Sequence, residues 1–249
     1  MVQVGGSSGS FDPGAEFDRQ VELLAAVSLV GRSGAELAAR LKPLRDLMFT
    51  VAGTSRGQAT TAAPPDVDRG EVPFVLVVTD AVAAVADAVP VLRVGTGAKP
   101  GIIDRNFRPG EPAAFRPVVE LPEGHAYLIT GVQRGDEFRN LPPRQAMDTL
   151  AGRGRTPLTI DEGIALARAI PGILARNKCF SLAGSGAGDK RVPALWISQG
   201  APKLGWCFAG VPHTWLGLAS CASRLGAGVE LDGVGGASDI SPAVFAAGE

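Results

Sequence analysis

Hydrophobic residues follow different periods in the two parts of this chain, and this constrains its fold more than any other feature. Between Phe17 and Leu44 they recur every three or four residues, as on one face of a helix. From Val72 onward most lie in short β-branched runs bounded by glycine or proline, which is typical of strands. Since these runs do not alternate with helices as in a parallel sheet, we predict an α+β fold with N-terminal helices packed on a mainly antiparallel β-sheet.

Local signals place several of the helices. Residues 33–36 and 159–162 have the spacing of a capping box, in which a hydroxyl and a glutamate satisfy N–H groups at a helix start. Two prolines open a further helix that we expect to end at Gly152. Pro43 should end or kink the second N-terminal helix, because proline lacks the N–H that the helix interior needs.

The expected strands are short and apolar. They are residues 72–78, 89–94, 115–121 and 126–132, followed by the runs CFSLAG, VPALWIS, KLGWCFA and TWLGLAS between residues 179 and 220, with a short helix expected in residues 80–88.

Composition divides the chain into one domain with polar ends. Residues 1–14 are rich in glycine and serine and predict a flexible leader, and residues 225–249 predict a poorly ordered tail. We expect a single domain over residues 15–224, with a linker or long loop at 53–71. The sequence indicates no oligomeric state.

Charge and cysteine content exclude several classes of protein. The chain has 24 basic and 25 acidic residues, so we expect no nucleic-acid partner. No apolar run has the length of a membrane span, and the start lacks the charged and apolar regions of a signal peptide, so we expect no membrane partner. Three cysteines, an odd number, indicate reduced thiols and a cytoplasmic location.

Four segments carry a resemblance to a known family. The runs RGRTPLTIDEG (153–163), CFSLAGS (179–185), VPALWIS (192–198) and PKLGWCFAGVPHTWLG (202–217) resemble a bacterial family of unknown function, found mainly in actinobacteria. The likeness includes FDRQVELL near the start and VPFVLVV, so it extends over most of residues 16–224. Because that family has no established activity, the resemblance implies no catalytic residues.

All three cysteines, all three tryptophans and one of two histidines lie between Cys179 and Cys221, so we look for a site there. Cys207, His213 and Cys221 could ligate a metal, but they lack the paired C-x-x-C spacing of zinc sites. Each cysteine lies in an apolar run, where a free thiol commonly behaves as a small buried hydrophobe. We therefore predict no metal.

A catalytic interpretation makes Cys207 a nucleophile and His213 its base, because an imidazole can lower the pKa of a thiol. Asp104 follows two isoleucines and could supply a carboxylate beside Cys207 and His213. The alternative for the histidine is a turn residue that is hydrogen-bonded to backbone. In the run Trp206-Cys207-Phe208, alternation places the thiol opposite the two aromatic side chains.

The tryptophans support a binding interpretation. Trp196, Trp206 and Trp215 lie in different expected strands and could line an aromatic pocket, with Lys203 and Arg191 at its rim. Such a pocket would suit a planar or anionic organic ligand. Alternatively, the three indoles fill the core under the N-terminal helices. The glycine-rich segments 95–101 and 184–191 match neither the P-loop nor the dinucleotide fingerprint, so we predict no cofactor.

Two function classes remain at this point. The first is a cofactor-independent enzyme acting on a small organic molecule, and the second is a non-catalytic module that binds a small molecule or another protein. A concave cluster of convergent polar groups around His213 would favour the enzyme, and an exposed flat aromatic patch would favour the module.

Overall fold

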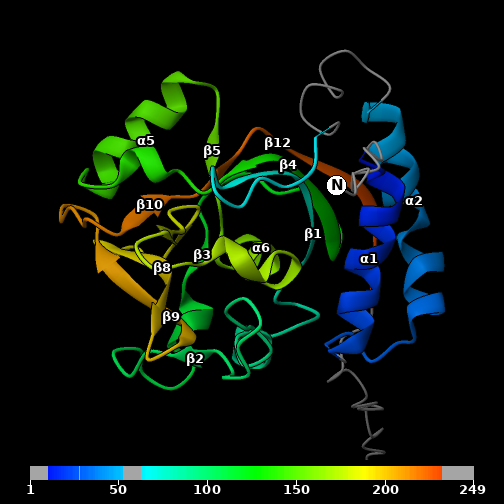
Figure 1. Ribbon diagram of the computed structural model, residues 1–249, viewed down its shortest axis with the longest axis horizontal. Helices are drawn as coiled ribbons and strands as arrows, with labels where there is room; N and C mark the ends of the chain where they lie inside the picture. Colours follow the sequence, from blue (N-terminus) through cyan, green and yellow to red (C-terminus); the bar gives the residue numbers. More distant parts are fainter. Residues whose placement is uncertain (1–10, 28, 53–62, 232–249) are drawn as a thin grey trace, which may run out of the picture.

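A computed structural model describes residues 11–27, 29–52 and 63–231. Its α-helices are α1 (Pro13–Ala26), α2 (Gly34–Ala52), α4 (Val85–Ala88), α5 (Pro143–Gly152) and α6 (Ile160–Ala169). Three 3-10 helices are η1 (Glu111–Ala114), η2 (Asp136–Phe138) and η3 (Pro171–Ile173). Figure 1 shows α1 and α2 side by side on one flank of the molecule and α5 on the opposite flank.

The strands form two larger sheets and a two-stranded ribbon. The first sheet has the order β1 (Glu71–Val78), β4 (Ala126–Gln133), β11 (Ser220–Cys221), β5 (Thr156–Pro157), and β12 (Ser223–Val229) also pairs with β4. The second has the order β10 (Leu216–Leu218), β6 (Cys179–Ser181), β8 (Arg191–Ser198), β9 (Ala201–Phe208), β2 (Ile102–Ile103). The ribbon joins β3 (Arg116–Pro117) to β7 (Ser185–Gly186).

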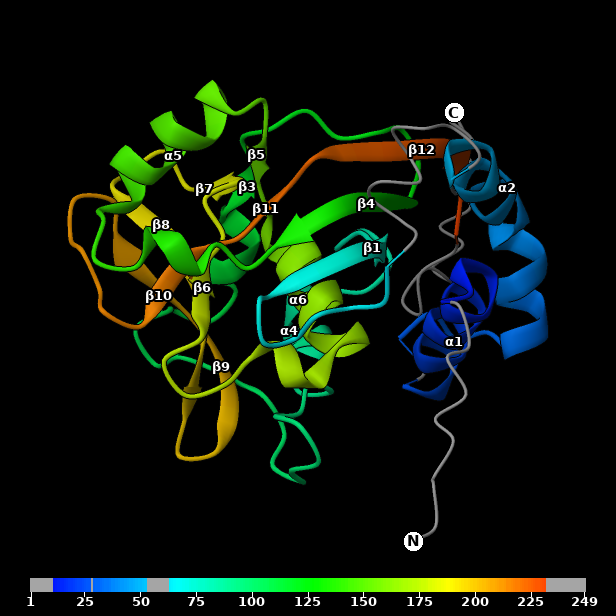
Figure 2. The same ribbon diagram turned by 45° about the horizontal axis from the view of Figure 1, so that its top comes forward.

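The predicted α+β class is confirmed. The pairs β1–β4, β4–β12 and β8–β9 are antiparallel, whereas β6–β10 and β2–β9 are parallel. Helices α1 and α2 contact the first sheet through β1, β4 and β12, and α6 contacts β1. Figure 2 shows α6 beneath β1 and β4, with α1 and α2 at their end. Every residue of β1 after Glu71 is buried, because helices enclose the strand.

Capping chemistry explains where the helices begin. Both capping boxes form, with Glu36 bonded to Ser33 and Glu162 bonded to Thr159. Helix α1 begins two residues before the expected position, since Asp12 accepts hydrogen bonds from the next backbone N–H groups and proline fits the first helical position.

Pro43 does not end the second helix. Helix α2 continues through Pro43 to Ala52. The ring lies on the exposed side, while Leu37, Leu41 and Leu44 are fully buried on the other. Burial of that apolar face outweighs the one backbone hydrogen bond that proline cannot donate.

In the part of the chain that the structure describes, β1 is an edge strand, and a side chain occupies its outer edge. Gln20 of α1 is 3% exposed. Its Oε1 accepts from the backbone N–H of Leu76 at 2.7 Å, and its Nε2 donates to the carbonyl of Phe74 at 3.3 Å. Arg168 of α6 also approaches this edge, with Nη2 3.5 Å from the carbonyl of Leu76. The primary amide thus replaces part of a neighbouring strand.

Two expected strands are absent or shortened. Residues 89–94 form turns, in which the N–H of Leu92 bonds to the carbonyl of Val89, although both side chains are fully buried. Burial of β-branched residues therefore does not require a strand here. Residues 115–121 contribute only β3, because Pro117 has no N–H to extend the pairing.

The chain ends of the predicted domain also differ from the expected positions. Strand β12 continues to Val229 and pairs with β4 beyond residue 225, and Leu231 is buried. Within the expected linker, Asp66 and Glu71 exchange two backbone hydrogen bonds around a turn. The leader up to residue 10, linker residues 53–62 and tail residues 232–249 lie outside the described residues.

Candidate functional site

The register of the second sheet separates the predicted site residues into two groups. Strand β9 pairs Cys207 with Val192 and Trp206 with Pro193 of β8. Since paired residues share a face and neighbours alternate, Cys207, Trp196 and Lys203 lie on one face, and Trp206 and Arg191 lie on the other. The expected alternation around Cys207 is therefore confirmed, but the three tryptophans do not converge.

The first face carries His213 and two of the tryptophans. The ring of Trp215 lies 5.5 Å from that of His213 and 6.0 Å from that of Trp196. Trp196 and Trp215 pack on a small hydrophobic core beneath α5. Cys207 belongs to this core. The Nε2 atom of His213 is enclosed and has no hydrogen-bond partner among the described residues. Burial lowers the pKa of His213, so the imidazole is neutral at pH 7.

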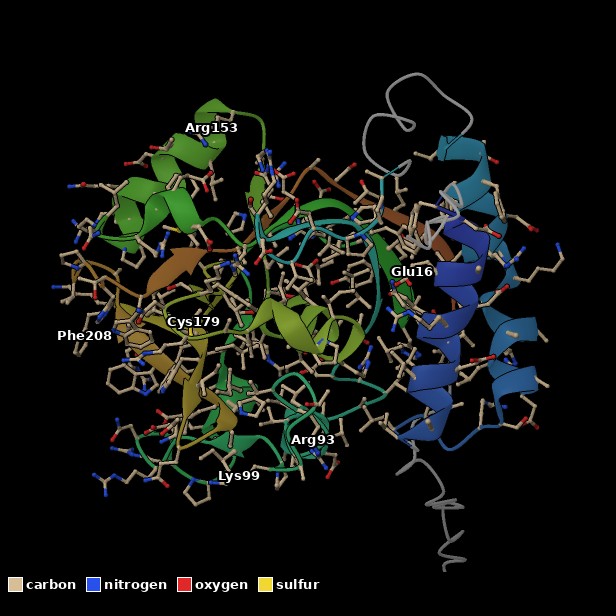
Figure 3. The ribbon with its side chains drawn as sticks, in the orientation of Figure 1. Glu16, Arg93, Lys99, Arg153, Cys179 and Phe208 are labelled. Carbon is tan, nitrogen blue, oxygen red and sulfur yellow. The ribbon has the colours of Figure 1, made fainter. Side chains whose placement is uncertain are left out.

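The turn that contains His213 is held by backbone contacts. The N–H of Asn140 donates to the carbonyl of His213 at 2.9 Å, and the N–H of Arg144 donates to that of Ala209 at 3.1 Å. Phe208 and Val211, at the same turn, are 51% and 44% exposed. Figure 3 shows Phe208 at the periphery of the molecule and Cys179 in its interior. This turn thus presents two half-exposed apolar side chains to the surface.

The thiols are poorly placed for nucleophilic chemistry. All three cysteines are free and buried, and burial raises the pKa of each thiol. The hydrogen-bond partner of Cys207 Sγ is Ser181 Oγ at 3.8 Å, and within the described ranges no hydrogen bond joins this thiol to His213. Among the same residues no group of three potential ligands could hold a metal ion. A reactive thiolate needs a positive neighbour and access to solvent, and Cys207 has neither.

On the second face, Arg191 links the sheet to η1. Its guanidinium lies 5.1 Å from the ring centroid of Phe115 and 5.3 Å from that of Trp206. It also forms ion pairs of 2.7 Å with Glu111 and with Asp189. Arg191 is therefore fully engaged by protein groups, and it positions η1 rather than offering a free cation at a rim.

Asp104 follows β2 and is held by two donors. Its carboxylate accepts from the N–H of Asn106 at 2.8 Å and forms a 3.0 Å ion pair with Lys203. Burial alone would raise the pKa of Asp104, but these two contacts and the nearby charge of Arg105 outweigh burial and lower it. The carboxylate thus stays ionised at neutral pH, which suits an electrostatic role better than proton transfer.

Gly205 allows this arrangement, because a side chain there would collide with its neighbours. A Cβ atom at Gly205 would lie 2.1 Å from Cη2 of Trp196 and 3.1 Å from Cβ of Asp104. The indole of Trp196 and the Cβ atom of Asp104 therefore both pack over Gly205.

Beside Asp104 lies a pocket of about 370 Å³, here named the Asp104 pocket. Most of its wall is apolar and comes from the α4 segment, β2 and the loop that leads into η1. Its larger apolar residues are Val85, Ile103, Phe107, Pro109 and Pro112. The ring of Phe107 packs edge-on against Phe115 at 5.5 Å, which connects the wall to Arg191. An apolar pocket of this size with a few charged groups is typical of small-molecule sites.

Two charged residues of this wall carry free cationic groups. Arg105 and Arg108 are both exposed and line the pocket. Within the described part of the chain, neither guanidinium has a hydrogen-bond or ion-pair partner. Neither arginine was predicted from the sequence as a site residue, and the contribution of α4 to the wall was not predicted either. The segment DRNFRPGEP, with two arginines around an aromatic residue and a turn, was the available signal.

A wider groove of about 940 Å³ lies along residues 63–73 and includes Arg155. Its charged groups are already engaged: Arg69 pairs with Glu71, and Arg155 bonds to Ser220 and to the carbonyl of Gly131. It therefore offers fewer free groups than the Asp104 pocket.

The start of α6 contains a second carboxyl group with an unusual environment. Asp161 Oδ2 accepts from the N–H of Asp80 at 3.0 Å. Burial and the nearby Asp80 carboxylate raise the pKa of Asp161 to about 7. The next residue, Glu162, is fully buried and binds Arg224 through both oxygens and the hydroxyl of Tyr127. Both carboxylates lie in the first turn of α6, and Glu162 also completes the capping box with Thr159.

No helix within the described ranges is long and apolar enough to cross a bilayer. No curated protein and no solved structure matches the chain. Residues 22–227 match the profile of a family of unknown function, DUF5701. Since the match extends over most of the chain, the protein belongs to the DUF5701 family.

Proposed function

We propose that this protein is a non-catalytic module that binds a small organic molecule in the Asp104 pocket. The observation that carries the proposal is the pocket itself: about 370 Å³ of largely apolar wall with an ionised carboxylate and two free guanidinium groups. Apolar walls supply most of the binding free energy, and a few charged groups orient the ligand.

A binding role is better supported than a cofactor-independent enzyme. Cys207 is a buried thiol bonded to serine, His213 is a neutral imidazole with an enclosed Nε2, and Asp104 is paired with Lys203. Within the described residues no hydrogen bond joins these three candidate catalytic groups, so they do not form a nucleophile–base pair.

Two further parts of the proposal come from composition and resemblance. We place the protein in the cytoplasm, because three free thiols persist in a reducing compartment. The near balance of charges supports a partner other than nucleic acid. An actinobacterial distribution of the family stays a prediction.

The test is titration calorimetry of the purified protein with two probes, uncharged 2-naphthylmethanol and 2-naphthoate. At about 0.4 kcal/mol for each non-hydrogen atom, such probes should bind with dissociation constants on the order of 0.1–1 mM. Ala86→Trp, on the exposed side of α4 and in the pocket wall, should fill the pocket and abolish binding.

Two further variants keep the test decisive. Ala113→Trp fills the pocket from η1, so it replaces the α4 variant if that helix is disturbed. Ala39→Trp is the matched control, because it adds the same side chain to an exposed position of α2. Absence of binding of both probes, or binding that survives both pocket variants, would refute the proposal.

A further inference from the structure

We infer that the ligand of the Asp104 pocket is an organic anion with an apolar body, whose anionic group is held by Arg105 and Arg108 at the mouth. This inference rests on the proposed function, and it adds the chemical class of the ligand and the two residues that select it.

The charges around the pocket leave an excess of positive groups. The Asp104 carboxylate pairs with Lys203 at 3.0 Å, and the Glu111 and Asp189 carboxylates both pair with Arg191 at 2.7 Å. Arg105 and Arg108 form no ion pair with the described residues, although their charges interact with the nearby Asp104 and Glu111 carboxylates. These four cationic and three acidic groups leave one net positive charge, which an anionic ligand would neutralise.

The backbone that bears these arginines is fixed before any ligand binds. The N–H of Phe107 donates to the carbonyl of Asp104 at 3.0 Å, which closes a turn around Arg105. The N–H of Arg108 donates to Glu111 Oε2 at 2.7 Å, and the N–H of Glu111 donates to the carbonyl of Arg108 at 2.9 Å. Both attachment points are thus ordered, and binding has to order only the two side chains.

Guanidinium chemistry narrows the ligand class to planar oxyanions. A guanidinium offers parallel N–H donors that match the two oxygens of a carboxylate. The apolar wall formed by Phe107, Pro109 and Pro112 lies next to them. Because an apolar wall excludes water, a guanidinium–carboxylate pair beside it is stronger than the same pair on a flat, solvated surface. A carboxylate on an apolar ring or chain combines both features.

A cationic ligand fits the same pocket less well. The one carboxylate in the wall, that of Asp104, is 8% exposed and already accepts from the N–H of Asn106 and from Lys203. An amine would have to displace Lys203 and approach two free arginines. Repulsion from these arginines disfavours that approach.

The experiment compares three probes of nearly equal size: 2-naphthoate, neutral 2-naphthamide and cationic 2-naphthylmethylamine. The wild type should prefer the naphthoate over the naphthamide by about tenfold at low salt. Arg105→Ala and Arg108→Ala should each weaken naphthoate binding about threefold, and the double variant should bind naphthoate and naphthamide equally. Binding of the naphthamide should not change.

The controls separate this inference from the proposed function. Arg40→Ala removes an exposed arginine of α2 and should leave all affinities unchanged. Added sodium chloride should reduce the preference for the naphthoate, because ions screen exposed pairs. Equal binding of naphthoate and naphthamide by the wild type, or tighter binding of the amine, would overturn the inference and leave the proposed function standing. Failure of every probe to bind would refute the proposed function itself.

Discussion

Replacing Asp161 by asparagine should stabilise the protein at neutral pH. The Asp161 carboxyl lies at the start of α6, accepts from the N–H of Asp80 and lies near the Asp80 carboxylate. Arg116 is 3.4 Å from Asp80 on the exposed side and compensates part of this charge. Asparagine keeps an oxygen that can accept from Asp80 and removes the buried negative charge.

The magnitude follows from the shift in the pKa of Asp161. Burial and the Asp80 carboxylate raise this pKa from 3.8 to about 7. One pKa unit corresponds to about 1.4 kcal/mol, so the full difference is about 4 kcal/mol at pH 8. The N-terminus of α6 favours a negative charge there by about 0.3–1 kcal/mol, which offsets part of the gain. We therefore expect an increase in the free energy of unfolding of about 2–4 kcal/mol.

The pH dependence has a definite sign. Between about pH 4 and pH 7 the folded protein keeps a proton on Asp161 that the unfolded chain releases, so stability falls as pH rises. Above about pH 7 both states are ionised at this residue and the penalty is complete. The stability difference between Asp161→Asn and wild type should therefore be small near pH 4, grow towards pH 7 and then stay constant.

Urea unfolding at a series of pH values measures this difference directly. Asp80→Asn removes one cause of the raised pKa of Asp161. The stability difference between the Asp161→Asn protein and its parent should then reach its plateau at a lower pH. Asp148→Asn, at an exposed position of α5, is the matched control and should leave stability unchanged. A gain of less than about 0.5 kcal/mol at pH 8, or one that does not vary with pH, would refute the reasoning.

Three further results are expected. Gln20→Leu should lower the free energy of unfolding by about 2–4 kcal/mol, because it leaves two buried backbone groups of β1 unpaired; an unchanged urea midpoint would contradict this. Gly205→Ala should lower the melting temperature by several degrees, since Cβ would overlap the ring of Trp196, whereas an unchanged melting temperature would show that the indole moves freely. A thiol reagent such as dithionitrobenzoate should label Cys179, Cys207 and Cys221 only at the rate of unfolding; rapid labelling of native protein would show that a thiol is accessible.

Features determined by neighbours in sequence were predictable. The capping boxes at Ser33 and Thr159 need only four residues each, and both form. Strands β1 and β4 follow from their apolar runs, and alternation alone placed Cys207 and Trp206 on opposite faces. In each case the deciding contact is local or repeats with a fixed period.

Features determined by distant residues were not predictable. The pKa of Asp161 depends on burial and on Asp80, 81 positions earlier in the chain. The Asp104 pocket combines residues 84–86 with 103–113 through tertiary packing. Pro43 is a further example. Proline in a helix interior is expected to end the helix, but burial of the apolar face of α2 outweighs this local preference.

The contact between Gln20 and β1 also has a consequence for how molecules of this protein behave towards one another. An edge strand with unpaired N–H and C=O groups is a template for a strand from a second molecule. The Gln20 amide occupies the N–H of Leu76 and the carbonyl of Phe74 from within the same chain. Helix α1 thus protects the edge of β1 from pairing with a strand of a second molecule. A chain shortened to begin after α1 should therefore associate in solution even where its sheet is intact.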